Sequence, residues 1–152
     1  MKMHYDIEGG NFSAAGRASS EIKKTLKQFN IAPALVRRIA IALYEAEVNV
    51  VAHAWKGTMN VDLTPEGINV VVEDEGPGIE DIGKAMEEGF STASDRVRQM
   101  GFGAGMGLPN IRKNCDEMYL SSTPGVGTRL EIKVYFGASS VCESCHRNFP
   151  AE

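Results

Sequence analysis

Residues 34–55 read ALVRRIAIALYEAEVNVVAHAW, and this stretch decides how the rest of the chain can fold. Its apolar residues recur at steps of three and four, which is the spacing of one face of an α-helix. Pro33 precedes the stretch, where proline favours the first turn of a helix. We therefore predict a long helix whose apolar stripe needs a second layer to cover it. The stripe consists of Leu35, Ile39, Leu43, Ala46, Val50 and Ala54.

The segments around this helix can supply that second layer. Short runs rich in β-forming residues, bounded by Gly- and Pro-containing turns, predict strands at residues 3–7, 58–63, 68–74, 119–122 and 128–136. Further helices are predicted from Ser13, as the N-cap, to about Asn30, near residues 81–88, and from about residues 108–110. This order favours an α+β fold. We expect a two-layer α/β sandwich, with a mixed, mostly antiparallel sheet covered by helices on one face.

Length and charge exclude several classes of protein. The chain has 152 residues, enough for one domain, and its 16 basic against 20 acidic side chains give a net charge of −4. An acidic balance argues against a nucleic-acid-binding protein. No apolar run approaches the ~20 residues of a membrane helix, and the N-terminus lacks the apolar segment of a signal peptide. We therefore expect a cytoplasmic protein with no membrane or nucleic-acid partner.

Three motifs could carry chemistry. In EAEVN (residues 45–49), Glu45 and Asn49 lie one helical turn apart, and their hard oxygens suit Mg²⁺. DEGPG (residues 74–78) follows a strongly apolar strand and ends it with a carboxylate and a tight turn. GFGAGMGL (residues 101–108) alternates glycines before a helix and could expose N–H groups to an anion. Taken alone, the first motif is also typical of a solvated helix face, the second of a plain turn and the third of a flexible linker.

Taken together and in this order, the motifs resemble those of the GHKL ATPases, the Bergerat-fold superfamily. Glu45-x-x-x-Asn49 is similar to its N box, Asp74-x-Gly76-x-Gly78 to its G1 box, and residues 101–107 to its G2 lid. The resemblance covers residues 1–136, which we expect to form the ATPase domain. It implies the Bergerat ATP-binding fold, with ATP and Mg²⁺ as cofactors.

The resemblance also implies roles for single residues. Glu45 would orient or deprotonate the attacking hydroxyl, Asn49 would bind Mg²⁺, and Asp74 would bind the adenine amino group. The other nucleotide-binding positions would be Gly76, Gly78, Gly101, Gly103, Gly105, Met106, Gly107, Leu108 and Thr128. Candidates for a cation on the γ-phosphate are Arg96, Arg98, Arg112 and Lys113. We interpret His53 as a packing residue and Glu47 as structural.

Within the superfamily, the lid region is similar to that of the anti-sigma factor serine kinases. Residues 103–109 look most like those of the stressosome switch kinases of that branch. The chain leaves no room for a transducer domain or for a helix with a phosphoacceptor histidine, so we expect a solitary ATP-binding domain that acts on another protein. The resemblance implies phosphorylation of Ser or Thr on a small STAS-domain antagonist, with a sigma factor or a phosphatase as further partners.

Other functions stay open at this point. A module that sequesters a partner in a nucleotide-dependent way, without transferring phosphate, needs Asn49, Asp74 and the glycines but not Glu45. A simple ATPase is a third alternative. A homodimer is compatible with the sequence.

Residues 137–152 form a predicted C-terminal tail that departs from the family. The tail contains Cys142, Cys145 and His146 in a CxxCH pattern. Two thiolates and an imidazole could supply three ligands of a Zn²⁺ site, and CxxC is also a redox motif. Haem attachment is not expected, because it takes place outside the cytoplasm. A tail without a role is the remaining alternative.

Overall fold

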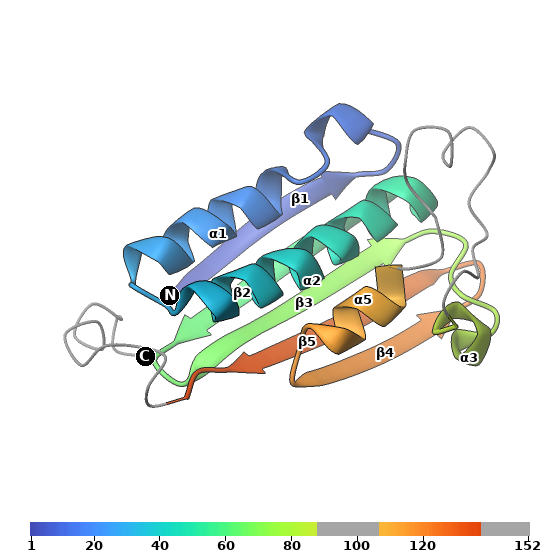
Figure 1. Cartoon of the computed structure of the whole chain (residues 1–152). Helices are drawn as coiled ribbons and strands as arrows, with labels where there is room; N and C mark the ends of the chain where they lie inside the picture. The colour runs from blue at the N-terminus through green and yellow to red at the C-terminus, as the bar shows by residue number, and fades with distance from the viewer. Residues whose placement is uncertain (88–106, 138–152) are drawn as a thin grey trace.

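The computed structural model describes residues 1–87 and 107–137 (Figure 1). The elements are β1 (Lys2–Glu8), the 3-10 helix η1 (Phe12–Ala14), α1 (Arg17–Gln28), α2 (Pro33–His53), β2 (Lys56–Thr64), β3 (Gly67–Glu75), α3 (Ile82–Ala85), α5 (Gly107–Lys113), β4 (Glu117–Thr123) and β5 (Gly127–Tyr135). In these described segments, no helix combines the length and hydropathy needed to cross a bilayer.

The five strands form one sheet in the order β1-β2-β3-β5-β4. All four pairings between neighbouring strands are antiparallel, so the described sheet has none of the parallel pairing that the predicted mixed sheet allowed. The hairpin β4–β5 is turned so that β5 lies beside β3, where Glu73 pairs with Arg129. The end of β3 therefore lies next to the start of β5.

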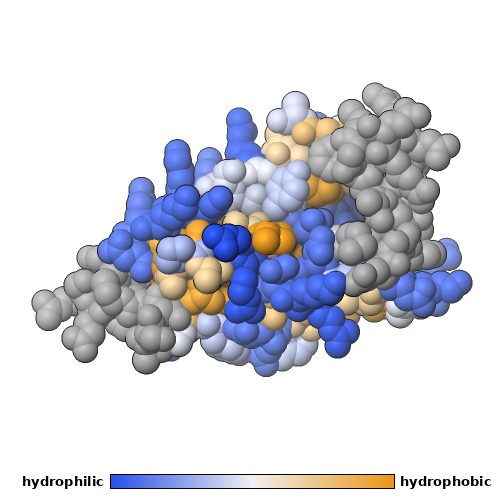
Figure 2. Space-filling view, viewed as in Figure 1, coloured by the Kyte–Doolittle hydropathy of each residue, from blue (hydrophilic) through white to orange (hydrophobic). Residues whose placement is uncertain are grey.

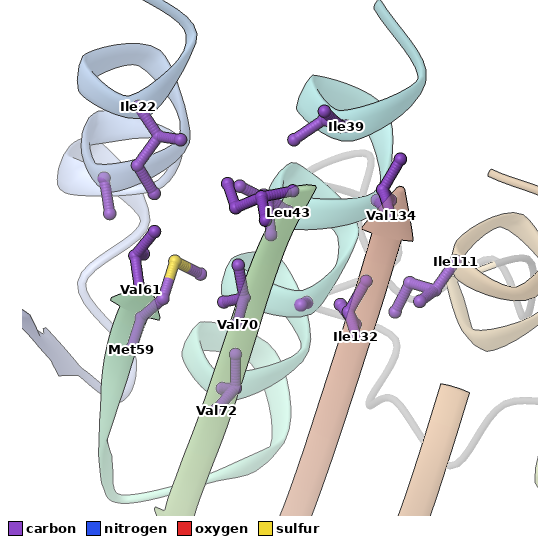
Figure 3. Close-up of a cluster of buried hydrophobic side chains, with 14 of the residues drawn as sticks. Ile22, Ile39, Leu43, Met59, Val61, Val70, Val72, Ile111, Ile132 and Val134 are labelled. Carbon is purple, nitrogen blue, oxygen red and sulfur yellow. The ribbon is translucent and has the colours of Figure 1, made fainter. Parts of the chain in front are cut away.

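The helices α1, α2 and α5 lie on one face of this sheet, which confirms the predicted two-layer sandwich (Figure 1). Apolar side chains from both layers point toward one another between them (Figure 3). Ile39 and Leu43 of α2 and Val70 of β3 are each no more than 1% exposed. Burial of one such side chain contributes about 1.5–3 kcal/mol, so this interface fixes how α2 sits on the sheet.

Seen from the helical side, polar side chains cover most of the described surface, with apolar patches between them (Figure 2). This pattern is what the amphipathic helices predict, because each helix turns its apolar stripe toward the sheet. Among the larger apolar side chains that stay exposed are Ile41 and Tyr44 of α2 and Trp55, which follows it.

The predicted start of the first helix is wrong. Ser13 lies in η1 and its Oγ donates to Oδ1 of Asn11 at 2.8 Å, whereas α1 begins at Arg17. The residue before α1 is Gly16, which has a positive φ of 94° and carries no capping side chain. The N–H groups of this helix end are instead satisfied by a residue far away in the sequence.

Candidate active site

The first part of the site lies between α2 and α5. Glu45 and Asn49 are half-buried on α2, one turn apart, and both face the first residue of α5. A Cβ placed on Gly107 would lie 3.1 Å from Oδ1 of Asn49 and 3.4 Å from Oε2 of Glu45. Gly107 thus lets the backbone approach both side chains closely, and the structure brings these three sequence-predicted residues together.

The position of α5 is set by the core. Ile111 is fully buried, Pro109 is buried, and the half-buried Leu108 packs against the core cluster. One turn after Gly107, Nδ2 of Asn110 lies 3.4 Å from Oε1 of Glu45 and donates to it. The sequence patterns did not indicate Asn110, because a lone asparagine in a short helix has no signature of its own.

The second part of the site lies at the end of β3. Oδ1 of Asp74 accepts the backbone N–H of Thr128, from the start of β5, at 3.1 Å. Burial raises the pKa of the Asp74 carboxyl, and the hydrogen bond from Thr128 offsets part of that rise. A Cβ on Gly127 would overlap the carbonyl oxygen of Asp74, so only glycine allows this close approach of the two strands.

The turn after Asp74 is held between two other segments. The N–H of Gly76 donates to the carbonyl of Val126 at 3.1 Å, and the N–H of Gly125 donates to the carbonyl of Pro77 at 2.7 Å. Gly78 has a φ of 74°, a conformation that favours glycine. A Cβ on Gly76 would lie 2.9 Å from Cα of Ala54, which places the turn against the end of α2.

A hydroxyl network supports Thr128. Oγ of Ser122 accepts the N–H of Ile79 at 2.7 Å and donates to the carbonyl of Gly127 at 3.0 Å. Because the Ser122 proton is used in this way, we assign Thr128 as the donor of the 2.8 Å hydrogen bond between the two hydroxyls. The Thr128 oxygen keeps acceptor capacity for a further group. Ser122 was missed in the sequence, where it read only as part of a strand.

Two other residues of α2 lie near the candidate site or behind it. Burial lowers the pKa of His53, so its half-buried ring is neutral at pH 7 and suits packing. Glu47 is 3% exposed, and its carboxylate accepts the N–H groups of Gly16, Ala18 and Ser19 at 3.0, 3.3 and 3.0 Å. Glu47 caps α1 across the fold, which confirms that it is structural.

A hollow of about 750 Å³ reaches Asp74 from the side of β1 and β2. The described part of its lining includes neither Glu45 nor Asn49. Its charged residues are mostly acidic: Asp6, Glu8, Glu47, Glu73, Asp74 and Glu75, against Arg17 and Lys56. Such a lining disfavours a polyphosphate in this hollow.

Several predicted residues cannot be placed. Gly101, Gly103, Gly105, Met106, Arg96 and Arg98 lie outside the described residues, as do Cys142, Cys145 and His146 of the tail. Of the cation candidates, Arg112 and Lys113 stand in the last turn of α5, beyond Asn110 and away from Gly107. Over the described residues, no group of three or more His, Cys, Asp and Glu side chains is arranged to hold a metal.

Two known proteins resemble this chain in sequence. The serine/threonine-protein kinase RsbT of Bacillus subtilis is 38% identical over 98 residues, which are 62% of this chain and 68% of that protein. An anti-sigma F factor of Caldanaerobacter subterraneus is 36% identical over 104 residues, which are 65% of this chain and 69% of that protein.

A solved structure shares the fold alone. The RsbU and RsbW domains of a Mycobacterium tuberculosis protein match with a TM-score of 0.61 at 13% identity, over 90% of this chain and 32% of that one. The family model described as the histidine kinase-like ATPase domain matches residues 12–134. This match covers most of the chain, and the protein therefore belongs to the histidine kinase-like ATPase domain family.

Proposed function

We propose that this protein is an ATP-dependent serine/threonine kinase that phosphorylates a small antagonist protein of the STAS type. The observation that carries the proposal is the pair formed by Glu45 and Asn49, which face Gly107 from one side of α2. A relative named as a serine/threonine-protein kinase and several named as anti-sigma F factors support it. We place this activity in the cytoplasm.

The residues present fit ATP and Mg²⁺. The amide oxygen of Asn49 is a hard ligand of the kind that Mg²⁺ prefers, and the glycine at position 107 leaves space in front of it that a Cβ would fill. When bound, ATP supplies the phosphoryl group and Mg²⁺ neutralises the charge on it. Arg112 and Lys113 stand in the last turn of α5, so Arg96 and Arg98 are the better candidates for a further cation.

The chain's own residues bind the adenine and the phosphates and accept the proton of the attacking hydroxyl. Asp74 has Oδ1 occupied by the Thr128 N–H, which leaves Oδ2 to accept a hydrogen bond from the adenine amino group. The turn at Gly76 and Gly78 shapes the adenine pocket beside it. Glu45 accepts the proton of the attacking hydroxyl, and Gly107 joins Gly103 and Gly105 in presenting N–H groups to the phosphates.

The test is transfer of labelled γ-phosphate from ATP to candidate STAS-domain proteins. We expect label on a serine or threonine of the true partner, and much slower labelling with Glu45→Gln. A complex that depends on nucleotide but carries no label would favour a sequestering module, and phosphate released only to water would favour a simple ATPase. A sigma factor, a phosphatase or a second copy of the chain would then be sought as the partner.

We propose a separate role for the tail, residues 137–152. Cys142, Cys145 and His146 would bind Zn²⁺, and the redox pair is the alternative. Metal analysis of the protein under reducing conditions, beside the Cys142→Ser, Cys145→Ser double variant, tests this role. Equal metal content in both would leave the tail either redox-active or without a role.

A further inference from the structure

Asn110 contacts the proposed base and none of the roles above uses it. Its side-chain Nδ2 lies 3.4 Å from Oε1 of Glu45, in a half-buried position between α5 and α2. An amide N–H aimed at a carboxylate is a charge-assisted hydrogen bond, and such bonds are about twice as strong as neutral ones. At 3.4 Å the bond is long, as contacts in active sites without substrate often are.

The two oxygens of Glu45 have different neighbours. Oε1 faces Asn110, whereas Oε2 lies 3.4 Å from the position of a Cβ on Gly107, beside Oδ1 of Asn49. Gly107 and Asn110 are three residues apart on α5 and so lie on the same face of that helix. The same face of α5 therefore binds Oε1 of Glu45 through Asn110 and leaves space beside Oε2 at Gly107.

The position of Asn110 is itself fixed by the fold. The neighbouring Pro109 and Ile111 are buried, and the side chain of Asn114 donates to the carbonyl of Asn110 at 2.7 Å. The amide is thus presented to Glu45 by a helix anchored in the core. A group held in this way can orient a carboxylate without moving itself.

We propose that Asn110 is a positioning residue for phosphate transfer, an inference that rests on the proposed kinase function. By holding Oε1, Asn110 turns Oε2 toward the hydroxyl of the protein substrate. Glu45 then takes the hydroxyl proton on Oε2 while the hydroxyl oxygen bonds to the γ-phosphorus and the bond from phosphorus to ADP breaks. In this role Asn110 acts only through Glu45.

The test separates rate from nucleotide affinity. We expect Asn110→Ala to slow single-turnover transfer to the partner by about 10- to 100-fold, the worth of a hydrogen bond to a charged group. ATP affinity should stay within about 3-fold, because a positioning residue that acts through Glu45 affects the transfer step and not nucleotide binding. Asn110→Leu keeps the volume and should behave alike. Asn60→Ala, at an exposed position of β2 away from α5, is the control and should transfer at the wild-type rate.

A double variant shows whether Asn110 works through Glu45. If it does, adding Asn110→Ala to Glu45→Gln should cause no further loss of rate, because the base is already absent. A further 10-fold loss, or equal losses of rate and ATP affinity in Asn110→Ala, would refute the positioning role. If wild type transfers phosphate and Asn110→Ala transfers as fast, only this inference fails.

If wild type labels no partner, the kinase function fails and the positioning role fails with it. The contact itself is then tested by the side-chain amide signals of Asn110 in an NMR spectrum, assigned by their loss in Asn110→Ala. Glu45→Gln should shift these signals and leave those of Asn114 in place. Unchanged Asn110 signals would show that the hydrogen bond does not exist in solution.

Discussion

Glu45 and Glu47 lie two residues apart on α2 and are used in opposite ways. Glu47 is 3% exposed, and its two oxygens accept three backbone N–H groups at the start of α1. Glu45 is half-buried, receives one long hydrogen bond from Asn110, and keeps Oε2 beside Gly107. Two residues correspond to about 200° around a helix, so the two carboxylates leave α2 in nearly opposite directions.

This difference shows what makes a carboxylate available for chemistry. Both oxygens of Glu47 are occupied by backbone N–H groups at the start of α1. Its hydrogen bonds therefore stabilise the packing of α1 on α2. Glu45 keeps an oxygen with no described protein donor, so it can accept a proton from outside. Both residues are glutamates, so residue type cannot distinguish their roles. What distinguishes them is the direction in which each side chain leaves the helix.

Glu45→Gln should give the largest effect. The amide keeps the shape of the side chain but cannot act as a base, and loss of a base typically costs 10²–10⁴-fold in rate. We expect single-turnover transfer to fall by about that factor while ATP affinity changes only a few-fold, as measured by calorimetry. Asn49→Ala should lose both. Transfer at the wild-type rate would show that Glu45 is not the base.

Glu47→Gln makes the same chemical change on the other side of the helix and should act on stability. The two carboxylate oxygens of Glu47 now share three backbone N–H groups, and in the variant one amide oxygen would have to accept all three. The new NH₂ group would face these N–H donors and could not accept from them. We expect the free energy of unfolding to fall by about 2–4 kcal/mol in urea titration. Glu45→Gln should change it by less than about 0.5 kcal/mol. Equal free energies of unfolding for the two variants would contradict the structural role of Glu47.

Asp74→Asn tests a carboxylate that is shared between fold and function. Its Oδ1 is used by Thr128, which an amide oxygen can also satisfy, but Oδ2 would be replaced by a donor. We expect ATP affinity to fall about 5- to 150-fold, the worth of about 1–3 kcal/mol. Because burial raises the pKa of this carboxyl, the neutral amide should leave the nucleotide-free protein at least as stable. Unchanged calorimetric affinity would remove Asp74 from the adenine pocket.

His53, in the last turn of α2, should give the smallest effect. Burial lowers its pKa below the ordinary 6.5, so the unfolded chain binds the proton more readily than the folded protein. Stability is therefore complete above about pH 6.5 and falls as the pH drops toward the folded pKa. We expect a loss below about 1 kcal/mol between pH 7 and pH 5.5 that is absent in His53→Gln. Equal losses in both proteins would assign the acid sensitivity elsewhere.

The sequence allowed prediction of those parts that depend on local pattern. The α2 stripe, the two hairpins and the pair formed by Glu45 and Asn49 follow from periodicity and spacing, and the structure places them as expected. The predicted start of α1 is wrong because the helix is capped by the carboxylate of Glu47, about thirty residues away. No local sequence pattern contains this capping residue. Asn110 and Ser122 were missed for the same reason, since each acts on a partner that only the fold brings near.

The interior place of β5, between β3 and β4, has a consequence for synthesis of the protein. β5 is the last described strand, yet it lies between β3 and β4 and supplies Thr128 to Asp74. While the ribosome is still making residues 76–126, β3 has an unpaired edge and Asp74 lacks this donor. Such long-range pairing is slow, and it leaves an open strand edge exposed for longer. The part of the candidate site around Asp74 therefore forms last, after Glu45 and Asn49 of α2 have already been synthesised.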